Sequence, residues 1–275
     1  MISIMLDIIK VGKIIILSND LDLIQIVRKI YPYCSCVGQN ENSDWIITVC
    51  KEDGVYCAKY KAFVYEKLSV NGLYYFLYEI IQVIIEEIMI QNELNILHGS
   101  VMERNGEAFI FSAKTNGGKS TLVFNLNYYG YNYISDDYAV IDNDICSIVP
   151  VHLPIKLRTL IPTPEIASEN VIVRDYNPIS IENYYLVRPF SFSENRSYRL
   201  RALFLLNRND KVSCINKLDY KDSYKNIILN SKEPDMKAVK RIASISLNLI
   251  KQIDVYELSY KDTFQCWNML KSLNN

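Results

Sequence analysis

The pattern of apolar and polar positions divides the first part of the chain into short elements. Residues 2–18 contain two apolar runs around Gly12-Lys13, which is the pattern of a β-hairpin. Apolar residues then recur at helical spacing over residues 20–30. Further strand-like runs stand at residues 45–49, 55–60 and 62–65. Because strand and helix patterns mix over a short length, we predict a small α+β module over residues 1–70.

A nearly continuous apolar run follows at residues 73–90, inside a predicted connecting helix over residues 71–94. Such a run would suit a membrane span, but it contains Glu79, Glu86 and Glu87. Carboxylates are costly in the hydrocarbon core of a bilayer. We therefore expect a mostly buried helix and no membrane partner.

Beyond residue 95 the apolar runs are again short. Residues 96–104 and 107–111 are predicted strands, and the Asn105-Gly106 pair between them is a strong hairpin signal. Further strands are predicted at residues 131–135, 138–141, 145–149, 153–158, 200–207 and 255–259, and helices at 122–129, 223–229, 235–251 and 261–273. Residues 159–198 are polar and rich in proline, and we expect an irregular excursion that serves as a lid or a substrate-contacting loop. These elements together predict a second domain over residues 95–275.

One loop of this domain, between the strand that ends at Phe111 and the next helix, has the composition of a phosphate-binding loop. A strand after the helix completes the βαβ context that such a loop needs. Successive backbone N–H groups and the positive end of the helix would form an anion site. The loop departs from the usual G-x-x-x-x-G-K-[ST] pattern at Ala113, which requires a negative φ, and at Asn116, which tolerates a left-handed conformation. We predict a nucleotide site made of Ala113, Lys114, Thr115, Asn116, Gly117, Gly118, Lys119, Ser120 and Thr121.

Four side chains of this stretch have predicted roles in chemistry. Lys119 would reach the terminal phosphates, and the Ser120 hydroxyl would bind Mg²⁺. Asp136 and Asp137 end the following strand, where open α/β sheets bind their ligands. Successive side chains of a straight strand point to opposite faces, so both carboxylates serve one site only if the chain turns there. We assign Asp137 as a base and Asp136 as a metal or water contact. The alternative is an ordinary helix N-terminus followed by a solvated strand end.

Composition and charge narrow the functional classes. Hydrophobic residues make up 49% and charged residues 22% of the 275 residues, which is ordinary for a globular protein. The formal net charge is −1, so no overall field recruits nucleic acid or an anionic membrane. The seven cysteines lack zinc-like spacing, and His98 and His152 are the only histidines. We expect reduced cysteines, no structural metal, no signal peptide and a cytoplasmic location.

With these motifs in place, the sequence resembles the HPr kinase/phosphorylase family. The residues that carry the resemblance are His98-Gly99, the loop of residues 112–121, Gly130 and Asp136-Asp137. The chain is most similar to HPr-kinase-related serine kinases of ribosomal peptide clusters, such as the lasso-peptide precursor kinases. The resemblance covers about residues 90–275. It implies a P-loop kinase domain of the HPr kinase/PEP carboxykinase-like type, behind a small N-terminal α+β module.

The resemblance also implies an activity and a role for each matching residue. The activity is transfer of the γ-phosphoryl group of ATP, with Mg²⁺, to a serine of a peptide or small protein. Lys119 matches the phosphate-binding lysine, and Ser120 matches the magnesium-binding hydroxyl. Asp137 matches the general base and Asp136 its acidic neighbour, while His98 matches the active-site histidine. Because HPr kinases are hexameric, the resemblance includes homo-oligomeric assembly among the expected partners.

One family feature has no counterpart here. The metal-binding glutamate of the E-I-R-G signature is absent, and only residues 154–159 (PIKLRT) lie near its expected place. This gives no reason to expect the reverse reaction or HPr as substrate. Within those residues, Lys156 and Arg158 either add positive charge to the site or are solvated surface cations. Two other functions stay open: a nucleotide-binding sensor or adaptor without catalysis, and a small-molecule hydroxyl kinase.

Overall fold

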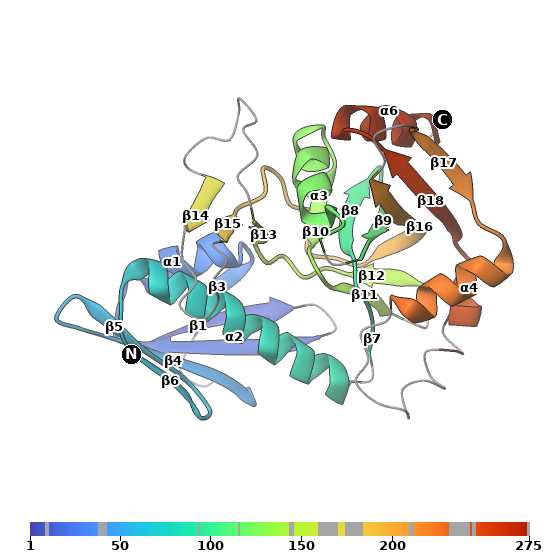
Figure 1. Cartoon of the computed structure of the whole chain (residues 1–275). Coiled ribbons are helices and arrows are strands. Elements are labelled where there is room, and N and C mark those ends of the chain that lie inside the picture. Colours follow the sequence, from blue (N-terminus) through green and yellow to red (C-terminus); the bar gives the residue numbers. More distant parts are fainter. Residues whose placement is uncertain are drawn as a thin grey trace. The chain divides into compact units, whose positions relative to one another are not determined.

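The computed structural model describes residues 1–8, 11–37, 43–92, 94–114, 116–142, 146–158, 170–173, 184–208, 212–230, 243 and 246–273. They form a mixed α/β fold with three sheets (Figure 1). The chain divides into two compact units, one of Met1–Asn92 with His152–Arg188 and one of Glu93–Val151 with Pro189–Asn275. The predicted ranges for the module, the connecting helix and the second domain therefore differ from the structure chiefly at residues 152–188, which pack with the first unit.

The first unit contains a six-stranded sheet in the order β3-β1-β2-β4-β5-β6. Its strands are β1 (Ile2–Ile8), β2 (Gly12–Ser18), β3 (Cys34–Val37), β4 (Trp45–Glu52), β5 (Val55–Tyr60) and β6 (Phe63–Leu68). The predicted hairpin over residues 2–18 is confirmed, because β1 and β2 pair antiparallel with Ile2 opposite Ser18. Gly12 and Lys13, however, are already part of β2. β3 was not predicted because its two cysteines and serine carry no clear alternation.

Two helices, α1 (Leu23–Ile30) and α2 (Val70–Gln91), belong to this unit. The N-cap of α2 is Ser69, whose side chain accepts a hydrogen bond from the Gly72 N–H at 3.1 Å. Most of α2 is buried, and Glu87, which the sequence placed in this apolar run, accepts hydrogen bonds from Tyr60 and Lys61. The prediction of a mostly buried helix is thus confirmed. Within the described part of the chain, no helix combines the length and the apolar character needed to cross a bilayer.

A small sheet in the order β13-β15-β14 completes the first unit. Its strands are β13 (Ile155–Leu157), β14 (Val171–Val173) and β15 (Tyr185–Val187). About half of the predicted lid over residues 159–198 falls outside the described residues, and its described parts include β14 and β15. Lys156 of β13 is half-buried and pairs with Glu79 of α2 at 3.0 Å, so it is not a freely solvated cation.

The second unit is built on a nine-stranded sheet. Seven of its strands follow the order β10-β8-β9-β16-β12-β11-β7, and β18 pairs with both β16 and β17. The strands are β7 (Asn95–Leu97), β8 (Ser100–Arg104), β9 (Glu107–Ser112), β10 (Asn132–Ser135), β11 (Ala139–Asp142), β12 (Ser147–Val149), β16 (Tyr198–Arg208), β17 (Cys214–Lys217) and β18 (Asp254–Tyr260). The predicted β8–β9 hairpin is confirmed. Asn105 (φ 55°) and Gly106 (φ 84°) are both left-handed, as a two-residue hairpin turn requires.

The predicted single strand over residues 96–104 is wrong, because the chain breaks at His98-Gly99. β7 pairs with β11, whereas β8 pairs with β9 and β10. At the break the backbone passes very close to β9. A Cβ on Gly99 would lie 2.8 Å from Ile110 Cγ2 and 3.2 Å from the Phe111 carbonyl oxygen. The apolar pattern does not reveal this break, because the strands before and after it, β7 and β8, are both largely buried.

The predicted βαβ unit is also more open than expected. β8 lies between β9 and β10, so the two strands that flank the helix are not direct neighbours. Both pair antiparallel with β8 and therefore run in the same direction. β16 is parallel to β9, and β18 is parallel to β16. The carboxyl ends of β9, β10, β16 and β18 consequently meet at one edge of the sheet.

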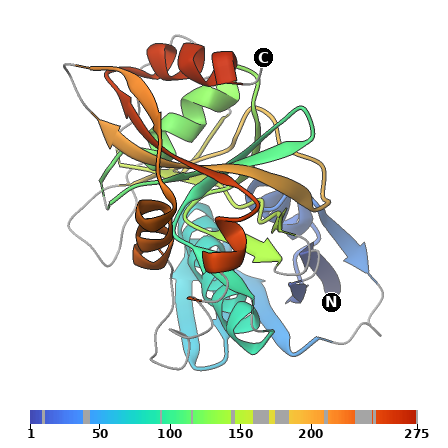
Figure 2. The same cartoon turned by 90° about the vertical axis from the view of Figure 1, so that its right-hand side faces the viewer.

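Helices cover both faces of this sheet, and Figure 2 shows α3 (Lys119–Tyr128) and α6 (Thr263–Leu273) on one side and α4 (Tyr220–Leu229) on the other. Ile227 of α4 and Leu249 pack with alternate residues of β9 and β16, including Ala108, Ile110 and Leu203. The predicted helix over residues 235–251 lies mostly outside the described residues, although residues 246–249 are helical. β17 was not predicted.

His152 provides a test of packing in the first unit. Its side chain is fully buried, and burial lowers its pKa to about 3. A histidine in an unfolded chain titrates near pH 6.5, so below that pH the unfolded chain binds a proton that the native state does not bind. The contribution of the neutral His152 to the free energy of unfolding is therefore fully present above about pH 6.5. It is lost as the pH falls toward the folded pKa.

We expect the free energy of unfolding of the wild type to fall by about 1.4 kcal/mol more than that of His152→Leu between pH 7.5 and 5.5. Urea unfolding of both proteins at the two pH values measures this difference. Equal losses of stability would show that His152 is protonated in the folded protein.

Candidate active site

The loop between β9 and α3 has the backbone conformation that its unusual sequence requires. Asn116 is left-handed (φ 67°), as is Gly118 (φ 84°), whereas Ala113 does not have a positive φ. Gly117 leaves no room for a side chain, because a Cβ there would lie 2.5 Å from the Ala113 Cβ and 2.8 Å from the Lys114 carbonyl oxygen. The loop is therefore tight at 113–118. Thr115 lies outside the described residues.

The loop leads directly into α3, which begins at Lys119 and not at the predicted residue 122. Ser120 and Thr121 are thus in its first turn. No side chain caps this helix, whereas Ser69 caps α2 and Asp219 caps α4. The first N–H groups of a helix have no partner within the helix. At α3 they are left for another acceptor, at the end of the helix that attracts anions.

Three predicted residues converge beside this helix end. The Lys119 ammonium nitrogen lies 3.0 Å from His98 Nε2 and 3.5 Å from Asp137 Oδ1, and His98 Nδ1 lies 3.9 Å from the same oxygen. The ammonium group only donates hydrogen bonds, so Nε2 must accept and the imidazole proton is on Nδ1. Lys119 is almost buried, with 7% of its side chain exposed, and Asp137 is its ionic partner.

The chain turns at Asp137, which is left-handed (φ 64°), so the two aspartates are not held on opposite faces of a straight strand. Asp136 is 6% exposed and accepts a hydrogen bond from Ser100 Oγ through Oδ1. Its Oδ2 is buried and accepts no hydrogen bond from any described residue. Burial, and then the charge of Asp137, raise the pKa of Asp136 to about 6, against the Ser100 and Ser120 hydroxyls. Asp136 is therefore an inner carboxylate and Asp137 an outer one.

Ser112 and Asn230 hold His98 in place, and neither was predicted from the sequence. The His98 N–H donates to the Asn230 carbonyl oxygen at 2.7 Å. Ser112 Oγ lies 2.7 Å from the His98 carbonyl oxygen and 2.8 Å from Asn230 Oδ1. The end of β9 and the end of α4 thus fix the turn that carries His98. Asn230 is 118 positions from Ser112 in the sequence, and no local pattern connects them.

Tyr260, the last residue of β18, forms one wall of the loop. Its phenol oxygen would lie 3.4 Å from a Cβ placed on Gly118. The side chain is 5% exposed, and burial raises its pKa to about 12, so the phenol is neutral. Arg208 at the end of β16 is opposite Tyr260 in the strand register. The sequence did not indicate either residue because both follow from the pairing of β16 with β18.

The donor set fits a magnesium ion held with nucleotide phosphates. Ser120 and Asp136 are near each other, and Asp136 Oδ2 is a buried carboxylate oxygen in need of a partner. Among the described residues there is no group of three or more His, Cys, Asp or Glu side chains that could hold a metal ion. Mg²⁺ characteristically uses one or two carboxylates with substrate phosphates and water, so two protein ligands suffice.

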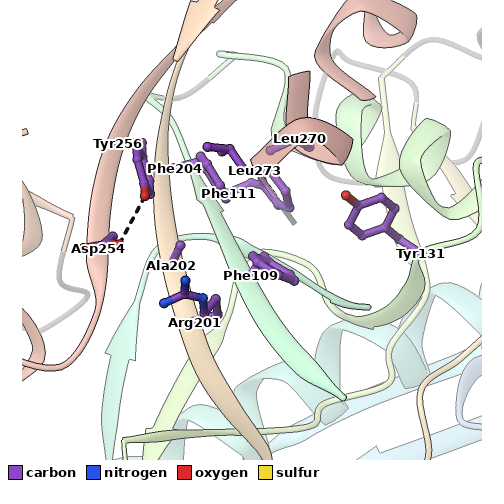
Figure 3. Close-up of a pocket in the computed structure, with 10 residues that line it drawn as sticks. All are labelled: Phe109, Phe111, Tyr131, Arg201, Ala202, Phe204, Asp254, Tyr256, Leu270 and Leu273. Atoms are coloured by element: carbon purple, nitrogen blue, oxygen red, sulfur yellow. Dashed lines mark hydrogen bonds between the residues drawn. The ribbon is translucent and has the colours of Figure 1, made fainter. Parts of the chain in front are cut away.

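A separate groove lies on the face of the sheet that α3 and α6 cover (Figure 3). Phe111, Phe204 and Tyr256 form its floor, with ring centroids 5.3 and 5.4 Å apart along the stack. Arg201 and Asp254 stand at its lower rim, near the amino ends of β16 and β18. None of His98, Lys119 and Asp137 lines the groove, so it adds no group to the site.

Comparisons with known proteins match the chain to solved structures alone. No family model matches the chain, and no curated protein is significantly similar to it. A solved structure, the HPr(Ser) kinase/phosphatase from Coxiella burnetii, is 12% identical, with a TM-score of 0.29, over 65% of this chain and 95% of that chain. A TM-score of this size carries no argument for a shared fold or activity. The resemblance to peptide serine kinases stays a prediction.

Gly117→Ala tests whether this loop binds nucleotide phosphates. The added methyl group would collide with Ala113 and Lys114 and displace the loop amides. We expect the affinity for Mg²⁺-ATP, measured by calorimetry, to fall by at least about tenfold, or about 1.4 kcal/mol.

Gly130→Ala is the matched control at the other end of α3. A Cβ at residue 130 would meet nothing within 4 Å, but the backbone there is left-handed (φ 89°). The substitution therefore lowers the stability of the protein without touching the loop. Unchanged ATP affinity in Gly117→Ala would argue against a phosphate site at this loop.

Proposed function

We propose that this protein is an ATP- and Mg²⁺-dependent kinase that transfers the γ-phosphoryl group to a serine hydroxyl of a peptide or small protein. The observation that carries the proposal is the convergence of Lys119, His98 and Asp137 beside the uncapped start of α3. Phosphoryl transfer depends on positioning and charge neutralisation more than on covalent chemistry. This cluster offers a cation and a carboxylate at one point, next to an anion site made of backbone amides.

On the phosphate side, the loop amides and Lys119 bind and orient the nucleotide tail. Gly117 and Gly118 keep side chains away from the amides, so that the backbone can approach an anion closely. Ser120 and Asp136 would hold Mg²⁺, which neutralises charge on the phosphate oxygens when it is bound. Asp136 is suited to this position because its inner carboxylate oxygen has no protein partner among the described residues.

On the acceptor side, Asp137 is the carboxylate that an incoming hydroxyl can reach. About a third of its side chain is exposed (34%), against 6% of Asp136. Asp137 would accept the proton of the attacking serine, while the neutral His98 keeps its Nδ1–H on the side of Asp137. Lys119, between loop and carboxylate, would stop the two negative groups from repelling each other as they approach.

The nature of the acceptor comes from the resemblance. The HPr-kinase-related enzymes of ribosomal peptide clusters act on serine, and the motifs at residues 98–137 match them. We therefore propose a ribosomally made precursor peptide as substrate, a cytoplasmic site of action and homo-oligomeric assembly. The net charge of −1 favours neither nucleic acid nor an anionic membrane as partner.

Asp137→Asn separates catalysis from binding. Asparagine tolerates the left-handed backbone at this position (φ 64°), so the turn is kept while the base is lost. We expect ATP affinity within about threefold of the wild type and a transfer rate lower by roughly 10²–10⁴-fold, the usual contribution of a general base. Mass spectrometry of a serine-containing peptide panel measures transfer. Wild-type rates in the variant would remove Asp137 from the mechanism, and ATP binding without any transfer by the wild type would indicate a nucleotide sensor.

Lys119→Met and Lys114→Met compare two cations of the same loop. Lys119 is nearly buried against Asp137, whereas Lys114 is exposed. Loss of a charge-assisted contact to phosphate costs about 1.5–3 kcal/mol, so Lys119→Met should bind Mg²⁺-ATP about 10- to 150-fold more weakly. Lys114→Met should bind it nearly as the wild type does. Equal effects of the two substitutions would contradict the assigned role of Lys119.

A further inference from the structure

The β4–β5 hairpin of the first unit brings two cysteines face to face. In the antiparallel register, Cys50 of β4 is directly opposite Cys57 of β5. A two-residue turn closes the hairpin, with Asp53 (φ 48°) and Gly54 (φ 80°) both left-handed. Both thiols are free and partly exposed. The turn and the strand pairing together place the two cysteine side chains next to each other.

Both thiols point to the same face of the sheet. Val49 and Ala58, the next pair along the hairpin, are fully buried on the packed face. Because side chains alternate along a strand, Cys50 and Cys57 lie together on the opposite face, where they remain accessible. A shift of the strand pairing by one residue would expose Val49 and Ala58, so the burial of these two side chains fixes the register.

The backbone spacing suits a disulfide. Directly opposed residues of antiparallel strands have Cα atoms about 4.5–5.5 Å apart, inside the range of about 4.4–6.8 Å that disulfides span. The other cysteines have no such partner. Cys36 is opposite Ile4 and Cys214 is opposite Ser259. The remaining three are buried: Cys34, Cys146 and Cys266.

We propose that Cys50 and Cys57 form a reversible dithiol–disulfide site that exchanges with low-molecular-weight disulfides such as glutathione disulfide. One thiolate attacks the glutathione disulfide, forms a mixed disulfide and releases one glutathione thiolate. The facing thiolate attacks the protein sulfur of this mixed disulfide and releases the second. The protein pair loses two electrons and two protons, which the two glutathione molecules take up.

This site is independent of the proposed kinase chemistry. Its residues belong to the first unit, whereas His98, Lys119 and Asp137 belong to the second. Oxidation links two strands of the six-stranded sheet covalently and restricts the unfolded chain, so the oxidised protein should melt at a higher temperature. Because the bond is on an accessible face, reducing glutathione or a dithiol should reopen it.

The experiment equilibrates the full-length protein with reduced and oxidised glutathione, traps free thiols by alkylation and maps the peptides after digestion with trypsin and Glu-C. Cleavage after Lys51 separates Cys50 from Cys57, and cleavage after Glu41 separates Cys50 from Cys34 and Cys36, so a disulfide between Cys50 and Cys57 appears as a defined linked peptide pair. We expect two of the seven thiols to be lost together, with Cys50 linked to Cys57. Oxidised glutathione should also raise the melting temperature, and dithiothreitol should reverse both changes.

Cys50→Ser and Cys57→Ser are the matched controls. Each variant leaves one thiol of the pair, so glutathione should stay attached to that cysteine as a mixed disulfide. Three results would overturn the proposal: no linked pair in the oxidised wild type, stable glutathione on both cysteines, or links of Cys50 or Cys57 to other cysteines at similar yield. The wild-type peptide map decides the matter even if a variant fails to fold.

Discussion

The second unit depends on a lysine ammonium group that is nearly buried at the carboxyl edge of a sheet. A charge in this position is costly unless an opposite charge and hydrogen bonds compensate it. Asp137 supplies the opposite charge at 3.5 Å, and His98 Nε2 accepts a hydrogen bond at 3.0 Å. The same two contacts that allow Lys119 to be buried also gather the groups that phosphoryl transfer needs. The requirements of folding and of chemistry thus coincide at one side chain.

The sheet topology explains how residues distant in the sequence reach that point. β9, β10, β16 and β18 end at one edge, and β8 starts there because it is antiparallel to β9. The edge therefore receives the loop after β9, the aspartates after β10, the histidine before β8 and Tyr260 at the end of β18. The tight crossing at Gly99 and the Ser112–Asn230 hydrogen bonds hold the histidine turn against β9. The functional groups thus come from the loops and turns at this edge and from the first turn of α3.

Local patterns predicted much of this arrangement, and long-range pairing accounts for the rest. The loop from Ala113 to Thr121, the turn at the aspartates and the Asn105-Gly106 hairpin follow from residue types whose conformations are set locally. The break at His98-Gly99 and the insertion of β8 between β9 and β10 depend on which strands pair, and alternation of apolar residues does not encode that choice. Ser100, Asn230 and Tyr260 were missed for the same reason, since each contacts the site through a distant strand or helix.

The most direct measurement is a structure of the protein with Mg²⁺ and a nonhydrolysable ATP analogue. We expect a triphosphate along the amides of residues 113–121, with Lys119 in contact with its terminal phosphates. Ser120 and Asp136 would be on the metal, and Asp137 would face the open side where an alcohol can approach. An analogue bound elsewhere, with the loop empty and Lys119 still paired with Asp137 and His98, would show that this loop is not the nucleotide site.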